Sequence, residues 1–383
     1  MTSAPFKLQR MPRDACGTCG HERQMIGRAR DRPQISYWPR LANDVRDKSE
    51  RLCEPRTSKF RVKPRMLRQS TLVNLNRGVI AMAPAPQPLF ILSPPRSFSS
   101  VVCAMLGQHP QCYGLPELQL FFGDTLGDLE NPNFLDQTIR SGLLRAFAQL
   151  HDGEQTEDSV IRARQWMKGR SNWPVRKVFD HIQELVGPRI LVEKSPATTF
   201  RRDYLGRLLR TFPNAHLLHL IRHPRATGES VMSLRAAHEA LQRVANARQN
   251  ITKWDPERTW RVCHTIAVTV TNDLPLGQCM RLKGEAMLSN LEFYLPQVCE
   301  WLGIRADAEA VEAMMHPENS PYAKPGPRSA QFGNDPNFLE NPAIDRERLA
   351  KLKEPRLAGE LSWRPGEMFT PETLRLARQF GYQ

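Results

Sequence analysis

Short apolar runs alternate with helix-like segments from about residue 88 onward. Three of these runs are typical of buried strands: 89–92, 189–192 and 215–221. Segments of helical character follow them, over 101–106, over 201–211 and from about Ala226. Strands that alternate with helices predict an α/β fold in which a parallel sheet is covered by helices on both sides.

The first 85 residues have a different texture. They are rich in arginine and proline and show no sustained apolar period, which predicts a mostly disordered extension. An Ala-Pro stretch at 83–88 has the composition of a linker, so residues 86–383 are expected to form one large domain. Met82 stands just before that linker. We therefore keep the hypothesis that the native chain begins near it.

The positive charge is concentrated in the same extension. Residues 1–80 contain 18 Lys and Arg against 7 Asp and Glu, which gives +11 of the total +14 and leaves +3 for the remainder. A body with so little excess charge is not typical of a nucleic-acid-binding domain. No apolar run reaches the roughly 18 residues of a membrane span, and the first residues do not form a signal peptide. A cytoplasmic protein is therefore expected.

Eight cysteines in a chain without a secretory signal do not indicate a disulfide framework. Cys16, Cys19, His21 and Cys53 would supply zinc-type ligands, but the paired second half of a zinc ribbon is absent. The rest of the chain shows no metal-ligand spacing. No metal site is predicted.

The first candidate site is SPPRSFSS at 93–100, between a strand and a helix. A parallel strand that ends in such a turn directs backbone N–H groups and the helix N-terminus at one point, which favours an anion. Arg96 adds a guanidinium suited to phosphate oxygens, and Ser97, Ser99 and Ser100 add hydroxyls. The spacing is not that of a Walker A motif. An ordinary turn with a serine cap is the alternative.

The second candidate site follows the third strand, where HLLHLI at 216–221 runs directly into RHPRATGES at 222–230. This strand also delivers a basic residue, Arg222, at its carboxyl end. Ser230 lies eight residues later, about two turns along the expected helix. Arg222 and Ser230 are therefore expected to hold one phosphate from two sides. For each residue alone, a surface arginine and a helix-face serine are the alternative.

Together the two turns make the chain resemble the sulfotransferases that use 3′-phosphoadenosine 5′-phosphosulfate (PAPS). The resemblance covers roughly residues 88–383 and rests on LFILSPPRSFSS at 89–100, LVEKSP at 191–196 and HLLHLIRHPRATGES at 216–230. It implies a P-loop NTPase-like sheet, PAPS as the donor substrate, and an acceptor that offers a hydroxyl or an amine. No metal is expected for this reaction.

The resemblance also assigns residues to the two ends of the donor. The 5′-phosphosulfate is expected at Arg96, Ser97, Ser99 and Ser100, and the 3′-phosphate at Arg222 and Ser230. One departure concerns Phe98, because many members of the family have glycine there. Its side chain must point away from the phosphate, or the loop must have another shape.

Sulfuryl transfer needs an in-line geometry, stabilisation of the leaving oxygen and a base for the acceptor's proton. Lys194 matches a lysine that some sulfotransferases carry at this strand end, and it is expected to stabilise the leaving phosphate oxygen. Glu117 is the expected base, because its segment is similar to the one where tyrosylprotein sulfotransferases place a catalytic glutamate. His109 is the competing base, although its place before Pro110 also indicates a helix end. An exposed strand-end lysine and a capping glutamate are the alternatives.

Two features lie nearer the C-terminus. In the family, a late basic loop often helps to enclose the donor, and Arg328 in KPGPR at 324–328 is the candidate here. Apolar positions at helical spacing over 291–301 predict a core helix that ends at Gly303 as its C-cap. Pro296 predicts that this helix begins or kinks there.

Two other classes of function remain as alternatives. A kinase-like enzyme on a similar fold would need a Walker A motif and an acidic magnesium site, and neither is evident. A nucleic-acid-binding protein would use the basic extension. The acceptor is not encoded in any motif, although 125–185 and 235–280 are expected to shape its cleft. The sequence does not predict the oligomeric state.

Overall fold

The first strand, β1 (Leu89–Leu92), is buried along its whole length. Phe90 and Leu92 join an apolar cluster on one face of the sheet, and Leu89 and Ile91 join a second cluster on the other. Successive side chains of a strand point to opposite faces, so a strand covered on both sides is apolar throughout. The computed structural model describes residues 85–130, 140–244 and 255–383, and all of these fall within one compact unit.

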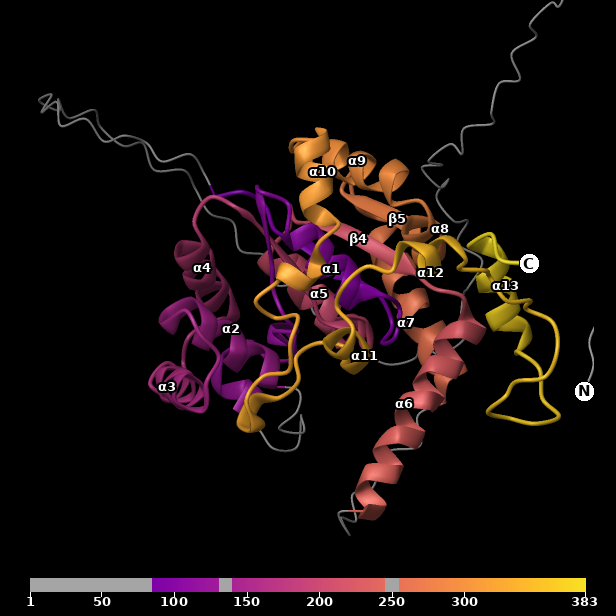
Figure 1. Ribbon diagram of the computed structural model, residues 1–383, viewed down its shortest axis with the longest axis horizontal. Helices are drawn as coiled ribbons and strands as arrows, with labels where there is room; N and C mark the ends of the chain where they lie inside the picture. Colours follow the sequence, from indigo (N-terminus) through magenta and orange to yellow (C-terminus); the bar gives the residue numbers. More distant parts are fainter. Residues whose placement is uncertain (1–84, 131–139, 245–254) are drawn as a thin grey trace, which may run out of the picture. The chain divides into compact units, whose positions relative to one another are not determined.

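Five parallel strands make the sheet in the order β2-β3-β1-β4-β5 (Figure 1). The other four strands are β2 (Cys112–Gly114), β3 (Ile190–Lys194), β4 (His216–Ile221) and β5 (Cys279–Lys283). The three predicted strands are confirmed as β1, β3 and β4. The sequence did not reveal β2, which has only three residues, or β5, whose Arg281 and Lys283 interrupt its apolar pattern.

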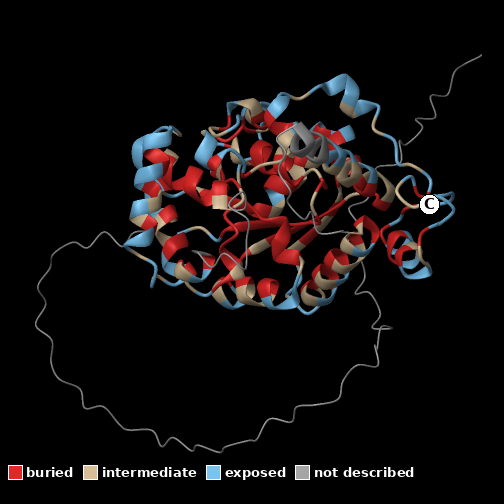
Figure 2. Cartoon of the chain, turned by 90° about the horizontal axis from the view of Figure 1, so that it is seen from below, coloured by how far each residue is buried: buried red, intermediate tan, exposed pale blue. Residues whose placement is uncertain are grey.

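Helices cover both faces of this sheet. The cluster around Phe90 is contributed by four helices: α2 (Ser141–Asp152), α3 (Glu157–Lys168), α4 (Val175–Val186) and α5 (Arg202–Thr211). The cluster around Ile91 is contributed by four others: α1 (Ser99–Gly107), α8 (Gly284–Ser289), α9 (Leu291–Leu302) and α10 (Ala308–Met314). Figure 2 shows the buried strands between the two helical layers. The predicted α/β fold is therefore confirmed.

A third group of helices packs beside β4. Trp260, Phe380 and Tyr382 build a third apolar cluster there. The helices of this region and of the loops near it are α6 (Pro224–Val244), α7 (Pro256–Thr271), α11 (Pro336–Glu340), α12 (Arg346–Ala350) and α13 (Pro371–Gln379). No helix among the described residues has the length and apolar character needed to cross a membrane.

The predicted helices hold with small shifts at their ends. The segments 101–106 and 201–211 correspond to α1 and α5, and α6 begins at Pro224. Gly303 caps α9 in the left-handed conformation, with φ 69°. Of the two alternatives predicted at Pro296, a helix start is wrong, because α9 begins at Leu291 and the proline lies inside it; a kink at Pro296 stays a prediction. Residues 1–84 of the predicted extension lie outside the described residues.

Candidate active site

Three strand ends meet at one edge of the sheet. β1 lies between β3 and β4, with Ile91 beside Lys194 and Leu92 beside His219. Parallel strands present their carboxyl ends at the same edge, where open α/β sheets bind ligands. The fold therefore brings Lys194, the turn after β1 and Arg222 after β4 to one place.

The first turn leaves β1 through two left-handed residues, Arg96 with φ 64° and Phe98 with φ 65°. α1 begins directly after Phe98, at Ser99, and no side chain caps its first N–H groups. Ser97 is buried, and its hydroxyl has no partner among the described residues. Uncapped helix N–H groups and an unpaired buried hydroxyl are features that an anion would satisfy.

Phe98 faces the start of α8 and the second turn. A Cβ on Gly284 would lie 2.6 Å from Cδ2 of the ring, so the glycine leaves the space that Phe98 fills. The guanidinium of Arg222 lies over the same ring, 4.2 Å from its centroid. Phe98 thus keeps a backbone conformation that glycine adopts readily, while its ring supports a cation of the second turn.

The second turn is hydrogen-bonded to the first. Nη1 of Arg222 donates to the carbonyl of Arg96 at 2.6 Å, and Nε of Arg96 donates to Oγ of Ser230 at 3.1 Å. Burial lowers the pKa of Arg222, and its Nε has no partner among the described residues. A buried guanidinium with an unused donor is suited to an anion.

The C-terminal segment supports this second turn. The hydroxyl of Tyr382 donates to Oε2 of Glu285 at 3.0 Å, and Oε1 of the same carboxylate accepts from the backbone N–H of His223 at 2.8 Å. Burial raises the pKa of Glu285. The indole of Trp260 donates to the carbonyl of Arg222 at 2.8 Å. Trp260 therefore holds Arg222, and Glu285 together with Tyr382 holds His223.

Lys194 connects the first turn to the predicted base. Its ammonium donates to Oγ of Ser100 at 2.7 Å and to Oε1 of Glu117 at 2.6 Å. The Lys194 side chain is fully buried, whereas that of Glu117 keeps 26% of its surface exposed. The lysine is therefore not the exposed strand-end residue of the alternative interpretation. It lies between the turn that is expected to bind the donor and a partly accessible carboxylate.

The backbone N–H groups of the two residues that follow Glu117 are each hydrogen-bonded to the end of β3 or to the residue after it. The N–H of Leu118 donates to the carboxylate of Glu193 at 3.1 Å, and the N–H of Gln119 donates to Oγ of Ser195 at 2.9 Å. Alternation along β3 puts Glu193 and Ser195 on one side and Lys194 on the other. The end of β3 therefore fixes both the backbone and the carboxylate of this segment.

Two further contacts restrict Glu117. Its own N–H donates to the carbonyl of Gly333 at 2.8 Å. Nε2 of Gln119, which has a left-handed backbone with φ 55°, donates to Oε2 of Glu117 at 3.2 Å. Glu193 is buried, and burial raises its pKa to about 7. Glu193 and Ser195 lie within LVEKSP, but sequence reasoning assigned a role only to Lys194 in that segment, and it missed these supporting residues.

The late loop reaches the site through a residue other than the predicted one. Arg328 is exposed and lies beside Glu157 of α3, whose carboxylate accepts from the N–H of Ser329 at 3.1 Å. The structure does not bring Arg328 together with the other predicted residues. Asp335 from the same loop forms an ion pair with Arg96, and its N–H donates to Oγ of Ser100 at 3.0 Å.

The competing base, His109, has both ring nitrogens occupied. Nδ1 accepts from the N–H of Gln111 at 3.0 Å, and Nε2 lies 2.9 Å from the carbonyl of Arg305. The ring is 1% exposed, and burial lowers its pKa. His109 therefore joins the end of α1 to the loop before α10, away from Lys194.

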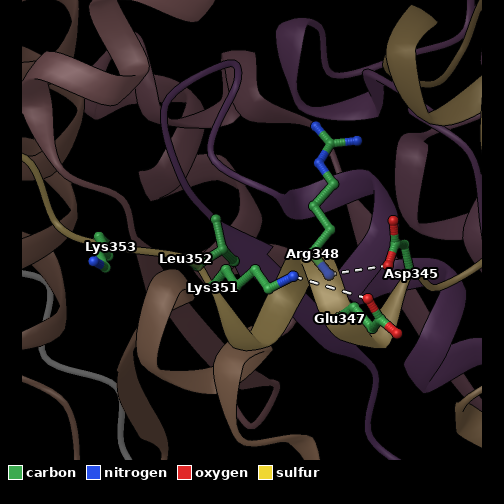
Figure 3. Close-up of a pocket in the computed structure, with 6 residues that line it drawn as sticks. All are labelled: Asp345, Glu347, Arg348, Lys351, Leu352 and Lys353. Atoms are coloured by element: carbon green, nitrogen blue, oxygen red, sulfur yellow. Dashed lines mark hydrogen bonds and ion pairs between the residues drawn. The ribbon is translucent and has the colours of Figure 1, made fainter. Parts of the chain in front are cut away.

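A hollow on the surface of α12 is separate from these groups. Its lining is Asp345, Glu347, Arg348, Lys351, Leu352 and Lys353 (Figure 3). Asp345 caps the helix, and Lys351 pairs with Glu347. In the described part of the chain, no cluster of three or more His, Cys, Asp or Glu residues has a metal-binding arrangement. Cys16, Cys19, His21 and Cys53 lie outside that part.

Comparison with known proteins identifies the family. The chain is similar to the sulfotransferase domain of the Synechococcus PCC 7002 olefin synthase, with 28% identity, a TM-score of 0.59, and coverage of 78% of this chain and 96% of that one. The sulfotransferase domain from the curacin biosynthetic pathway shares the fold, with 23% identity, a TM-score of 0.62, and coverage of 78% and 98%. No curated protein sequence matches.

The model of the sulfotransferase family matches residues 88–308, which is 221 of the 383 residues. This range contains β1 to β5 and both turns. The match begins one residue before β1, so it omits the predicted extension. The chain belongs to the sulfotransferase family.

Proposed function

We propose that this sulfotransferase takes its sulfuryl group from PAPS and transfers it to a hydroxyl or amine of the acceptor, with Glu117 as the base and Lys194 at the leaving oxygen. The observation that carries the assignment is the pair of contacts of Lys194, with Ser100 at 2.7 Å and Glu117 at 2.6 Å. A donor group on the first turn and an acceptor hydroxyl beside Glu117 would meet at this lysine.

The donor would span the two turns. Its 5′-phosphosulfate would bind the N–H groups at the start of α1 with the side chains of the first turn, which are Arg96, Ser97, Ser99 and Ser100. Its 3′-phosphate would bind Arg222 and Ser230. Nε of Arg222 and the hydroxyl of Ser97 have no partner among the described residues, and these anions would satisfy both buried donors.

The chemistry requires one bond to form and one to break. The acceptor oxygen bonds to sulfur while the bond from sulfur to the bridging oxygen of the 5′-phosphate breaks. The acceptor's proton passes to the carboxylate of Glu117. The electron pair leaves on the phosphate of adenosine 3′,5′-bisphosphate. Once Glu117 is protonated it no longer pairs with the Lys194 ammonium, which is then free to stabilise the new charge on the leaving oxygen.

Calorimetric titration with adenosine 3′,5′-bisphosphate tests the donor class. We expect micromolar binding without added metal and much weaker binding of ATP. A folded sample that binds ATP better, or binds it only with magnesium, would favour a kinase and contradict the proposal. Binding of RNA or DNA that survives when residues 1–80 are deleted would favour a nucleic-acid-binding body.

The acceptor is proposed only by chemical class. The side chain of Glu117 keeps 26% of its surface exposed, and the hydroxyl or amine of the acceptor would approach this exposed part. Residues 125–185 and 235–280 remain our proposal for the walls of the acceptor cleft.

A further inference from the structure

Asp335 is the ion-pair partner of Arg96, the cation of the first turn. Its carboxylate pairs with Nη1 of Arg96, and its N–H donates to Oγ of Ser100 at 3.0 Å. Side-chain exposures are 7% for Arg96 and 24% for Asp335, so the pair is largely shielded from water. Burial lowers the pKa of Arg222, and the carboxylates that act against this effect are first Glu285 and then Asp335. One carboxylate therefore acts on cations of both turns.

The loop that carries Asp335 is held in place by buried contacts. Arg145 of α2 is fully buried and donates to the carbonyls of Lys324 at 2.6 Å and Phe332 at 3.0 Å. Gly333, with φ 108°, packs so closely on Gly142 that a Cβ would lie 2.6 Å from its Cα. The carbonyl of Gly333 accepts from the N–H of Glu117. Asp335 is thus a defined part of the site.

Two of the three guanidinium nitrogens of Arg96 already have a partner. Its Nε is bound to Ser230, and its Nη1 to Asp335. A phosphosulfate placed beside the Asp335 carboxylate would meet a like charge in a shielded site, where repulsion is stronger than in water. The carboxylate has another partner, because Oδ1 also accepts from the N–H of Asn337 at 2.9 Å as the N-cap of α11. It can therefore leave Arg96 and still be hydrogen-bonded.

We propose that Asp335 is the counter-ion of Arg96 before the donor binds, that the 5′ group of the donor displaces it, and that this competition sets donor affinity. This inference rests on the proposed function. When the bisphosphate product leaves, the carboxylate returns to Arg96, so the same competition favours product release. Since Gly333 of the same loop also binds the backbone N–H of Glu117, displacement of Asp335 would also shift the position of this base.

The test is the affinity of adenosine 3′,5′-bisphosphate for Asp335→Asn, measured by calorimetry beside the wild type. Asparagine caps a helix about as well as aspartate, so the substitution removes the charge and keeps α11. We expect binding about tenfold tighter, because one charge-assisted contact no longer competes. Asp335→Ser, another capping residue without charge, should give the same gain. Thermal melting checks that each variant is folded.

Asp307→Asn is the matched control. Asp307 also caps a short helix, α10, and also pairs with an arginine, Arg305, at 2.7 Å on the surface. Its substitution should leave bisphosphate affinity unchanged. Adenosine 3′-monophosphate, which lacks the 5′ group, should show no gain with Asp335→Asn. An equal gain with this ligand would mean a general charge effect and would overturn the displacement.

The outcomes separate the two levels of the proposal. If the wild type binds the bisphosphate and both Asp335 variants bind it equally or more weakly, the counter-ion role is wrong and the proposed function stands. If only the Asp335 variants bind detectably, the competition is supported in its strongest form. If no folded variant binds the bisphosphate, the counter-ion role and the proposed function both fall.

Discussion

The two turns at the edge of the sheet share a plan and differ in their attachments. Each follows a parallel strand and carries an arginine, and β1 and β4 are neighbours. The first turn is attached through Ser100 to Lys194 and Glu117. The second is attached through His223 and Glu285 to Tyr382 near the C-terminus. We infer that substitutions of Lys194 and Glu117, to which the first turn is attached, should affect turnover, whereas those around the second turn should affect mainly donor binding.

The largest effect is expected at the base. Glu117→Gln should reduce turnover by about 10²–10⁴-fold, because the amide cannot accept the acceptor's proton. Affinity for adenosine 3′,5′-bisphosphate should remain nearly unchanged. Steady-state kinetics with an acceptor found by screening, together with calorimetry, measures both quantities. Glu309→Gln on the surface of α10 is the control. Unchanged turnover would assign the base elsewhere.

Arg222→Ala tests the second turn. We expect donor affinity to fall by about 10–100-fold, since a hydrogen bond to a charged group contributes about 1.5–3 kcal/mol. Turnover at saturating donor should change far less. Calorimetry with the bisphosphate measures the loss, and Arg176→Ala, an exposed arginine paired with Asp180, should show none. Wild-type affinity in Arg222→Ala would erase the assigned difference between the turns.

The strand before the second turn has a pH dependence that β1 lacks. His219 and His264 are fully buried, 2.8 Å apart, and burial lowers both pKa values, that of His264 to about 3. Arg281 also faces His219 and lowers its pKa. The unfolded chain binds protons below about pH 6.5 and the folded pair does not, so stability falls as pH decreases from there.

Urea unfolding at pH 7 and pH 5 measures this effect. His264→Gln should make the decrease smaller by about 2 kcal/mol, because a histidine that titrates only when unfolded costs about 1.4 kcal/mol per pH unit. The slope with urea should stay the same. An undiminished decrease would mean that other groups govern acid sensitivity.

The smallest effect concerns Phe98, where the two turns touch. Both Phe98→Ala and Phe98→Gly remove the ring under Arg222, but only glycine relieves the positive φ. Glycine should therefore be more stable than alanine by about 1 kcal/mol. At Arg162, an exposed position within α3, the alanine variant should instead be more stable than the glycine variant. Alanine being the more stable at position 98 would refute the left-handed turn.

Much of the fold was readable because it depends on local pattern. β1, β3 and β4 are runs of buried apolar residues, and α1, α5 and α6 follow at helical spacing. Pro296 gave one wrong alternative for α9, a helix start at the proline. A proline excludes one hydrogen bond, but the apolar face of Leu295, Val298 and Leu302 holds the helix on the core. Burial outweighed the local signal.

In the site, too, local sequence pattern located some of the residues and not others. The predicted pair Lys194 and Glu117 lies in contact, and Arg96 meets Ser230 across the two turns. Arg328 was chosen for its charge in a late loop, yet Asp335 makes the contacts from that loop. Charge alone did not indicate which loop residue reaches the sheet edge, because the path of the loop is set by Arg145 and Gly333.

The sequence by itself determined the class of fold, the family and the two strand-turn segments, because apolar runs and the residues next to them are local properties of the chain. The tertiary structure decided which partners these segments have. Glu193, Gln119 and Asp335 are distant from one another in the sequence. They meet at the site only because parallel strands end at a common edge of the sheet. Contacts between residues distant in sequence arise from packing, and no local pattern records them.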